Sequence, residues 1–250
     1  MMNPSEMANI ARVEESLWWY RGMREISFAL LDPVMASAGV RRALDAGCGT
    51  GCFAGALERR YGVEVYAIDL ESEAMRFCRS RRTLHPARAS IASLPFGDGT
   101  FDLVASMDVL VHFPPGEERA PFGELVRVLR PQGLLLVRVA ALRALRSRHS
   151  QYIWEEQRFT RGKLEELARA HRLQILRLTY ANFLLTPVAL LKFRVYEPLT
   201  RQSPASGVRP LAAPVDWLLH LPLQIERFWL SRGFGFPWGQ SLFLLARKQG

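Results

Sequence analysis

Residues 44 to 51 of this chain read Leu44-Asp45-Ala46-Gly47-Cys48-Gly49-Thr50-Gly51. Glycine at three alternate positions lets the backbone turn sharply and come close to a ligand, because none of the three carries a Cβ atom. Residues 41–46 have the short, partly apolar composition of a strand end, and residues 52–60 that of a helix. A second predicted strand, residues 63–68, leads to Asp69. A nucleotide-type motif requires this context, in which a strand, a glycine turn, a helix, a second strand and an acid follow one another.

The glycine spacing differs from that of a dinucleotide-binding turn, which would read Gly-x-Gly-x-x-Gly. Here the pattern is Gly47-x-Gly49-x-Gly51, preceded by an acid at Asp45. This run resembles the first motif of the class I S-adenosylmethionine-dependent methyltransferases, in particular a bacterial small-molecule branch of the "type 11" kind. The alternative is an ordinary glycine-rich loop in a Rossmann-like protein of another function.

Three later motifs extend the resemblance over about residues 41–140. They are Leu94-Pro95-Phe96, Phe101-Asp102-Leu103-Val104 and Val128-Leu129-Arg130-Pro131-Gln132-Gly133. The family fold that this implies is α/β: a Rossmann-like, doubly wound, seven-stranded sheet with an antiparallel last strand. Periodicity and turn residues predict helices at 71–82, 117–129 and 160–170. They also predict strands near 87–89 and at 101–107, 134–139, 173–180 and 240–247, with a tight turn at 130–133.

The core is expected at residues 41–180 and 240–250, with two additions. Residues 1–40 form a helical entry segment with an aromatic cluster from Leu17 to Arg24, which either covers the site as a lid or packs in the core. Residues 181–239 fall between the last two strands and contain a Pro/Ser/Gly-rich joint at 201–207, flanked by apolar helical pieces. An insertion of this size is expected to be a helical cap over the site.

The resemblance assigns the cofactor, S-adenosyl-L-methionine, to a set of residues. The methionine side would lie against the glycine turn, the ribose hydroxyls against Asp69 and the adenine against Leu70. Where the family usually has an aspartate at the adenine edge, this chain has Ser90, a weaker partner than a carboxylate. The full set expected to bind the cofactor is Tyr20, Arg24, Asp45, Gly47, Cys48, Gly49, Gly51, Asp69, Leu70, Ser90, Ile91, Met107 and Asp108.

Two histidines are candidate proton acceptors, His112 and His149, because imidazole titrates near neutrality. His112 is equally consistent with simple packing beside the cofactor. The segment 149–160 resembles a substrate-covering stretch of one bacterial branch, or it is only the entry to a helix capped by Thr160. The residues expected to contact the substrate are Trp19, Tyr152, Arg158, Tyr180 and Asn182.

The composition and charge of the chain disfavour several classes of function. The chain has 250 residues and a net charge of +9, but 30 of its 33 basic residues are arginine and they are spread along the sequence without interleaved aromatic residues. This pattern does not favour a nucleic-acid platform. Three cysteines without a paired spacing do not indicate a metal site. No run of eighteen uncharged apolar residues and no signal-like start occur, so a cytoplasmic protein is expected.

The sequence therefore predicts a methyltransferase that acts by in-line displacement on a small, partly apolar acceptor through O, N or C, as in secondary metabolism. The cap is rich in Leu, Phe and Trp, which favours such an acceptor. Three alternatives stay open: a peripheral membrane or lipid-associated enzyme, a cofactor-binding protein without activity, and an RNA methyltransferase. No nucleic-acid partner is expected, membrane contact would be transient, and the oligomeric state would be monomer or homodimer.

Overall fold

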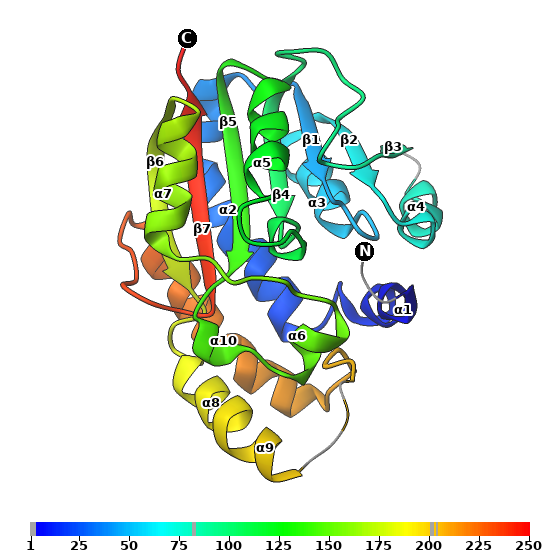
Figure 1. Ribbon diagram of the computed structural model, residues 1–250, viewed down its shortest axis with the longest axis vertical. Coiled ribbons are helices and arrows are strands. Elements are labelled where there is room, and N and C mark those ends of the chain that lie inside the picture. Colours follow the sequence, from blue (N-terminus) through cyan, green and yellow to red (C-terminus); the bar gives the residue numbers. More distant parts are fainter. Residues whose placement is uncertain (1–3, 82–83, 201–202, 204) are drawn as a thin grey trace.

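A computed structural model describes residues 4–81, 84–200, 203 and 205–250. Seven strands form one sheet in the order β3-β2-β1-β4-β5-β7-β6, in which β7 runs antiparallel to β5 and β6 (Figure 1). The predicted α/β class and antiparallel last strand are confirmed. The strands are β1 (Arg42–Ala46), β2 (Glu64–Asp69), β3 (His85–Arg88), β4 (Phe101–Met107), β5 (Leu129–Ala140), β6 (Leu173–Ala181) and β7 (Ser241–Lys248).

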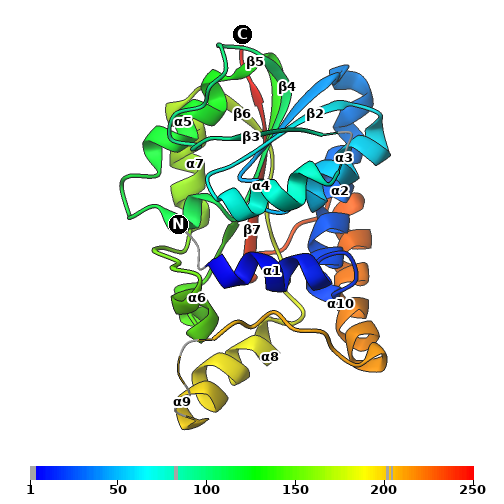
Figure 2. The ribbon, with the colours of Figure 1, turned by 90° about the vertical axis from the view of Figure 1, so that its right-hand side faces the viewer.

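Helices cover both faces of the sheet (Figure 2). The main ones are α1 (Pro4–Val13), α2 (Trp18–Ala38), α3 (Cys52–Tyr61), α4 (Ser72–Arg79), α5 (Arg119–Arg127), α6 (Arg148–Tyr152), α7 (Arg161–Ala170), α8 (Thr186–Leu191), α9 (Glu197–Thr200) and α10 (Ala213–Ser231). Short 3-10 turns are η1 (Leu110–His112) and η2 (Arg143–Leu145), and a π-helical segment, η3 (Lys192–Tyr196), joins α8 to α9.

The central strands are apolar throughout because both of their faces are buried. Along β5, Leu135 and Val137 pack with α5 and α7, whereas Leu134 and Leu136 pack with α2 and α3. This alternation follows from the two-residue period of a strand, which sends successive side chains to opposite faces. The sheet thus separates two apolar cores, and its carboxyl edge is left to carry the site.

Several predicted boundaries shift. The tight turn expected at 130–133 lies inside β5, where Gln132 has a φ of 63° and the pairing with β4 changes register between Phe101 and Leu103. A bulge of this kind absorbs extra residues without ending the strand. The helix predicted at 117–129 is shorter, and the short strand expected near 87–89 begins earlier, at His85. Residue 82 of the expected helix 71–82 lies outside the described residues.

The entry segment 1–40 divides into two parts with different surroundings. Helix α2 packs in a core, with Ile26 and Leu31 fully buried, while α1 lies across the open end of the sheet near α4. Only α1 is therefore placed as a lid would be. The aromatic cluster begins α2 and does not precede it, because the helix starts at Trp18.

The segment between β6 and β7, residues 182–240, is here called the cap. Its α10 packs closely along α2: a Cβ added at Gly22 would lie 2.2 Å from Leu223 Cδ1. Helices α8 and α9 form the end of the molecule opposite the C-terminus (Figures 1 and 2). Of the joint predicted at 201–207, residues 201, 202 and 204 lie outside the described residues. No helix in the described ranges is both long and apolar enough to cross a membrane.

Candidate active site

The glycine turn has a backbone that side chains would obstruct. Gly47, Gly49 and Gly51 have φ angles of 84°, 53° and 78°, in the left-handed region that glycine adopts without strain. A Cβ at Gly47 would lie 2.2 Å from Val109 Cγ2, which follows β4 in the chain. The N–H groups of Gly47 and Cys48 both donate to the carbonyl of Ile68, each at 2.8 Å. The motif therefore fixes the turn between the ends of β1, β2 and β4.

Asp69 stands at the carboxyl end of β2 and helps to hold this turn. One of its carboxylate oxygens accepts the Gly49 N–H at 2.9 Å, and the other accepts the Glu71 N–H at 2.9 Å. A carboxylate has about four acceptor sites, so two hydroxyl groups can still be bound by the same side chain. Asp69 is thus oriented toward the cavity before any ligand arrives.

Asp45 is a buried carboxylate with one oxygen, Oδ2, that has no hydrogen-bond partner among the residues that the structure describes. Burial, and then the charge of Asp69, raise the pKa of Asp45 to about 7. An unpaired carboxylate oxygen in a buried position is costly unless a ligand supplies a donor or a positive charge. A cofactor that carries an ammonium and a sulfonium meets this requirement, so the donor and acceptor set of the turn fits S-adenosylmethionine.

A cavity of about 420 Å³ opens from the glycine turn and lies within the size range of ligand sites. All the residues expected to bind the cofactor line it, except Gly51, and so do Trp19, His112 and His149. At the predicted adenine edge, the Ser90 hydroxyl oxygen accepts the Ala92 N–H at 3.2 Å and keeps its own hydrogen for a ligand. Gly51 is instead the N-cap residue of α3, and a Cβ there would lie 2.8 Å from Cys78 Sγ.

The remaining expected substrate residues are not brought to the cavity. Arg158 pairs with Glu155 at 2.7 Å and donates to the carbonyl of Ala141 at 3.0 Å, so it braces the chain that follows β5. Tyr180 packs with the core on the α5 and α7 side, and Asn182 is fully buried beside Glu226, which accepts its N–H. Tyr152 lies on α6 outside the lining. The Thr160 cap of α7 is confirmed, because its side chain accepts the Lys163 N–H.

The structure adds residues that the sequence did not single out, chiefly Glu6, Glu14 and Arg138. Arg138 pairs with Asp108 at 2.6 Å, and its guanidinium lies 5.0 Å from the centre of the Trp19 ring. A single arginine inside the apolar run 134–139 was a signal that could have been used, since a lone buried charge needs a partner. For Glu6 the sequence offers no such signal.

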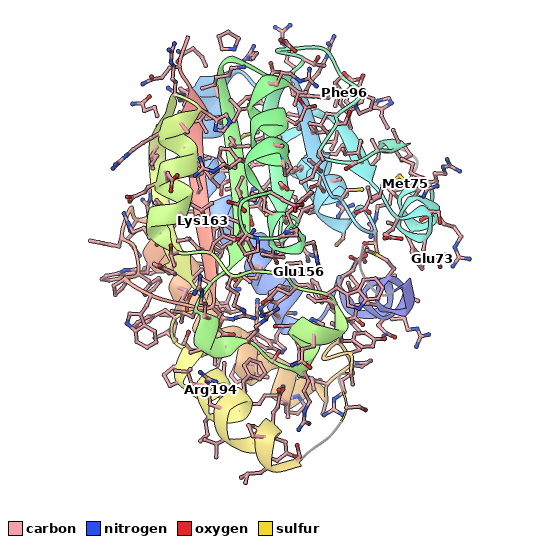
Figure 3. The ribbon with its side chains drawn as sticks, in the orientation of Figure 1. Glu73, Met75, Phe96, Glu156, Lys163 and Arg194 are labelled. Atoms are coloured by element: carbon pink, nitrogen blue, oxygen red, sulfur yellow. The ribbon has the colours of Figure 1, made fainter. Side chains whose placement is uncertain are left out.

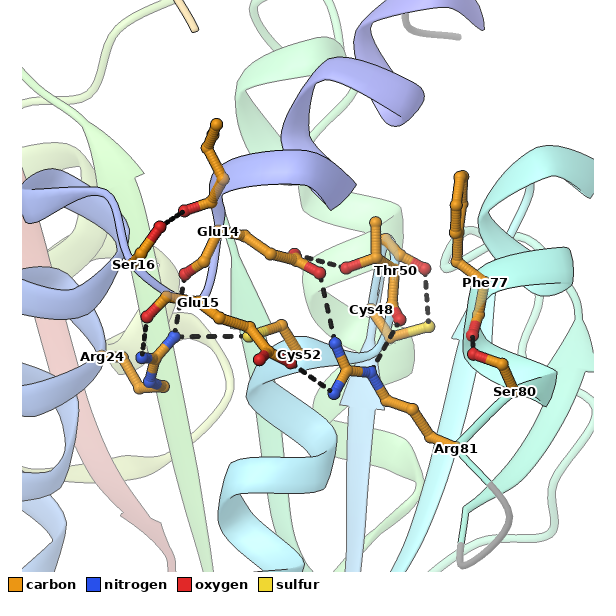
Figure 4. Close-up of polar contacts among 12 residues, drawn as sticks. Glu14, Glu15, Ser16, Arg24, Cys48, Thr50, Cys52, Phe77, Ser80 and Arg81 are labelled. Carbon is orange, nitrogen blue, oxygen red and sulfur yellow. Dashed lines mark hydrogen bonds and ion pairs between the residues drawn. The ribbon is translucent and has the colours of Figure 1, made fainter. Parts of the chain in front are cut away.

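The link between α1 and α2 is tied to the glycine turn by polar contacts (Figure 4). The Thr50 hydroxyl donates to Glu14, whose carboxylate also lies 3.3 Å from Arg81 Nη2. Burial raises the pKa of Glu14 against the opposing effects of these two partners. Arg24 donates to the carbonyls of Glu14 and Glu15, at 3.2 and 3.3 Å. These contacts fix the end of α1 against the glycine turn and the start of α2.

The two histidines differ in the nitrogen that is left for chemistry. His112 Nδ1 lies 3.3 Å from the carbonyl of Trp154, which can only accept, so its proton is on Nδ1 and its Nε2 is a free base. His149 Nδ1 accepts the Gly207 N–H at 3.1 Å, so its neutral ring carries the proton on Nε2. Burial lowers the pKa of both residues. His112 is therefore oriented as a proton acceptor and His149 as a hydrogen-bond donor.

Glu6 is fully buried on α1, and one of its oxygens, Oε1, accepts no hydrogen bond from any residue in the described part of the chain. Its other oxygen accepts from the Asn9 amide at 3.2 Å. His149 Nδ1 lies 3.7 Å from Oε1, but that nitrogen is already an acceptor and does not donate to the carboxylate. Glu6 therefore brings to the cavity lining a carboxylate oxygen that can still accept a hydrogen bond.

Comparison with known proteins agrees with this geometry. Residues 44–137 match the family model described as a methyltransferase domain. The chain is 33% identical over 127 residues to a malonyl-[acyl-carrier protein] O-methyltransferase of Methylovorus, covering 46% of this chain and 42% of that protein. It is 31% identical over 138 residues to the chloroplastic tocopherol O-methyltransferase of Arabidopsis thaliana, covering 52% and 36%. The matches thus span about two fifths of the length of these relatives.

Among solved structures, the fold is similar to that of geranyl diphosphate C-methyltransferase from Streptomyces coelicolor, determined with S-adenosyl-L-homocysteine. The TM-score is 0.57 with 15% identity, over 87% of this chain and 77% of that one. Strand order, glycine turn and matched segment together identify residues 44–137 as a methyltransferase domain of the class I family, whose cofactor is S-adenosylmethionine.

Proposed function

We propose that this protein transfers a methyl group from S-adenosylmethionine to a small, partly apolar molecule. The observation that carries the proposal is one continuous cavity, which joins the glycine turn and Asp69 to a second region around Trp19, His112 and His149. A cofactor bound at the turn would supply a methyl group activated by a sulfonium. The chain's own residues would bind and orient the two reactants and exclude water.

The cofactor side is expected to work by position and charge. Asp69 would bind the ribose hydroxyls, Asp45 the positively charged methionine end, and Leu70 with Ile91 the adenine. Displacement at a methyl carbon needs little acid–base chemistry, and its rate depends mainly on near-attack geometry in a dry pocket. The contacts of Glu14 with Thr50 and Arg81 hold α1 in place and would keep water from that pocket.

The acceptor side mixes apolar walls with one free base and one free carboxylate. Ile10, Trp19 and Ile153 line the cavity as well, which favours an acceptor with an apolar part. His112 Nε2 would take the proton from a hydroxyl or amine acceptor, and an alkene carbon would need no such base. Glu6 Oε1 is available to accept a hydrogen bond from a donor group on the same molecule.

Calorimetry followed by a transfer assay tests the proposal. Wild-type protein is expected to bind S-adenosylmethionine, and Asp69→Ala is expected to weaken binding by about 100-fold through loss of a charge-assisted bidentate contact. Glu64→Ala is the matched control, because Glu64 is an exposed acid on the same strand, β2. Labelled methyl transfer to a library of phenols, amines and prenylated compounds then identifies the acceptor. Cofactor binding without transfer to any compound would favour a binding protein without activity.

A further inference from the structure

The cap exposes an unusual amount of apolar surface. Among the described residues, the large apolar side chains classed as exposed lie almost entirely between Leu184 and Trp238; the exceptions are Leu70 and Trp154. Single exposed apolar residues are common on proteins, but a contiguous set marks a surface that binds something. The partner of this apolar surface is indicated by the charges around it.

Helix α10 carries the largest part of this surface. Its outward side chains recur at helical spacing, so that they share one face: Trp217, Leu218, Leu221, Ile225, Phe228 and Trp229. Its opposite face holds Leu223 and Leu230, which are buried against the body of the protein. A surface helix normally turns a polar face to solvent. Here the outer face is apolar as well.

The segment α8–α9 repeats this arrangement at the end of the molecule. Val188, Leu191, Val195 and Leu199 are exposed at intervals of three to four residues, with exposed fractions of 49–78%. Figure 3 labels Arg194 at this end, between the two helices. Both apolar faces therefore belong to the cap and to no other part of the described chain.

The acids of the cap do not point to its outer face. Its three carboxylates are engaged inward: Glu197 accepts the Arg148 N–H at 3.1 Å, and Asp216 accepts the Trp18 N–H at 2.7 Å. Glu226 is fully buried and accepts two backbone N–H groups, those of Asn182 and Leu184. The cap thus presents no free acid among its described residues.

The cations of the cap have the opposite distribution. Lys192, Arg194, Arg209, Arg227 and Arg232 are exposed, and within the described ranges none forms an ion pair with a carboxylate. The Arg232 guanidinium lies 3.4 Å from the centre of the Phe228 ring, and Lys192 Nζ lies 5.3 Å from that of Phe193. Positive charge without a carboxylate partner in the described residues therefore lies against the apolar face of α10 at Arg232 and beside Phe193 at Lys192.

We infer that the outer face of the cap binds the surface of an anionic lipid membrane. Trp, Phe and Leu would enter the boundary between headgroups and acyl chains while the cations meet anionic headgroups. A second copy of this chain on the same face would bring like charges together, which disfavours a symmetric dimer. Charge complementarity thus selects the lipid surface.

This placement also bears on the acceptor. Gly207 of the cap donates its N–H to His149, and His149 lines the cavity. Membrane binding would hold the cavity beside a source of apolar molecules, which deepens the proposed function and in this respect rests on it. The binding itself requires neither the cofactor nor methyl transfer, so it can fail or succeed independently.

Vesicle flotation with the full chain is the test. Wild-type protein is expected to float with vesicles of phosphatidylcholine and phosphatidylglycerol, to remain unbound with phosphatidylcholine alone, and to be released as salt rises. Arg194→Ser with Arg227→Ser should lower the partition coefficient by about 30-fold, at roughly one factor of five per cation. Arg59→Ser with Arg79→Ser is the matched control: these exposed residues of α3 and α4 change the net charge equally and should bind as wild type.

Leu218→Ser with Phe228→Ser separates the apolar contribution. This variant should lose binding at all salt concentrations while keeping its cofactor affinity. The proposal is overturned if wild-type protein does not float with anionic vesicles, or if the control pair loses as much binding as the cap pair. It is also overturned if light scattering shows that the wild-type protein is a dimer that does not bind vesicles, and that Leu218→Ser with Phe228→Ser turns this dimer into monomers.

Discussion

The two sides of the cavity are built from the chain in different ways. The cofactor side comes mostly from residues 45–108, in which successive strands end at one edge of a parallel sheet. The side proposed here for the acceptor combines Glu6, Trp19, Arg138 and His149, which are far apart in the sequence and meet only when α1, α2, β5 and α6 are packed. One side is therefore encoded by a continuous motif and the other by tertiary contacts. Substitutions should affect the two sides separately.

The largest effect is expected for Gly47→Ala on the cofactor side. The new Cβ would collide with Val109 and would stand at a φ of 84°, so cofactor affinity should fall by about 30- to 100-fold. Gly62→Ala is the control, because its φ of 65° carries similar strain but nothing lies within 4 Å of the added atom. Calorimetry measures both. Equal losses in the two variants would show that backbone strain alone, and not the close approach to Val109, accounts for the effect.

Gly22→Ala should disturb the packing of the cap helix α10 on α2 and leave the cofactor side of the cavity intact. Its Cβ would lie 2.2 Å from Leu223, and such overpacking costs about 1–3 kcal/mol of unfolding free energy. Gly162→Ala, in open space on α7, should instead stabilise by about 0.5–1 kcal/mol. Denaturant unfolding checks both values, and cofactor affinity should be unchanged. A large loss of cofactor affinity in Gly22→Ala would mean that cofactor binding depends on how the cap packs against α2.

Asp45→Asn should separate charge from shape on the cofactor side. Because the pKa of Asp45 is raised to about 7, wild-type protein should bind the cationic cofactor more weakly as pH falls below 7, by up to tenfold per pH unit. The asparagine variant should bind weakly with little dependence on pH. Calorimetry from acidic to mildly basic pH measures this. A variant that kept the wild-type pH profile would assign the titration to another group.

The same shift has a consequence for stability without cofactor. The pKa of Asp45 is about 7 in the folded protein, against 3.8 for the ordinary carboxyl group. Its protonation therefore contributes to the free energy of unfolding in full below pH 3.8, and this contribution is lost as the pH rises through about 7. Asp45→Asn should therefore raise the melting temperature most above pH 7. A melting temperature lower than that of wild type at that pH would contradict the assignment of Asp45 as an unpaired buried acid.

The smallest effect is expected for Glu6→Gln on the acceptor side. The amide keeps the shape of the side chain but is a weaker acceptor, so the KM for an acceptor bearing a donor group should rise by about 3- to 10-fold. Cofactor affinity should stay as in wild type. Glu73→Gln, at an acid of the surface helix α4, is the control. Steady-state kinetics with the identified acceptor measure these KM values. An equal KM in wild type, Glu6→Gln and Glu73→Gln would show that Glu6 does not bind the acceptor.

Local sequence patterns carry the information on the fold around the glycine turn. The glycine spacing with Asp69, through the resemblance that it carries, led to the seven-stranded sheet with an antiparallel last strand, and nearly all the expected cofactor residues line the cavity. After β5 local patterns are less informative. Arg158 and Asn182 were expected to contact the substrate, but Arg158 braces the chain after β5 and Asn182 lies buried against the cap. A polar residue near a strand end has the same appearance in sequence whether it faces a ligand or a neighbouring segment, because its partner is distant in the chain.

The sequence by itself determined the glycine turn, because the spacing of its residues fixes their geometry within one strand–turn–helix unit. Through the family resemblance that this turn and the later motifs carry, it also indicated the fold class and the cofactor. The tertiary structure decided which oxygens and nitrogens are free. Only packing shows that Glu6 Oε1 lacks a donor, that His112 and His149 present different nitrogens, and that the acids of the cap are engaged inward while its cations are not. Hydrogen-bond partners and burial are properties of the folded chain, and they determine what the site and the cap can bind.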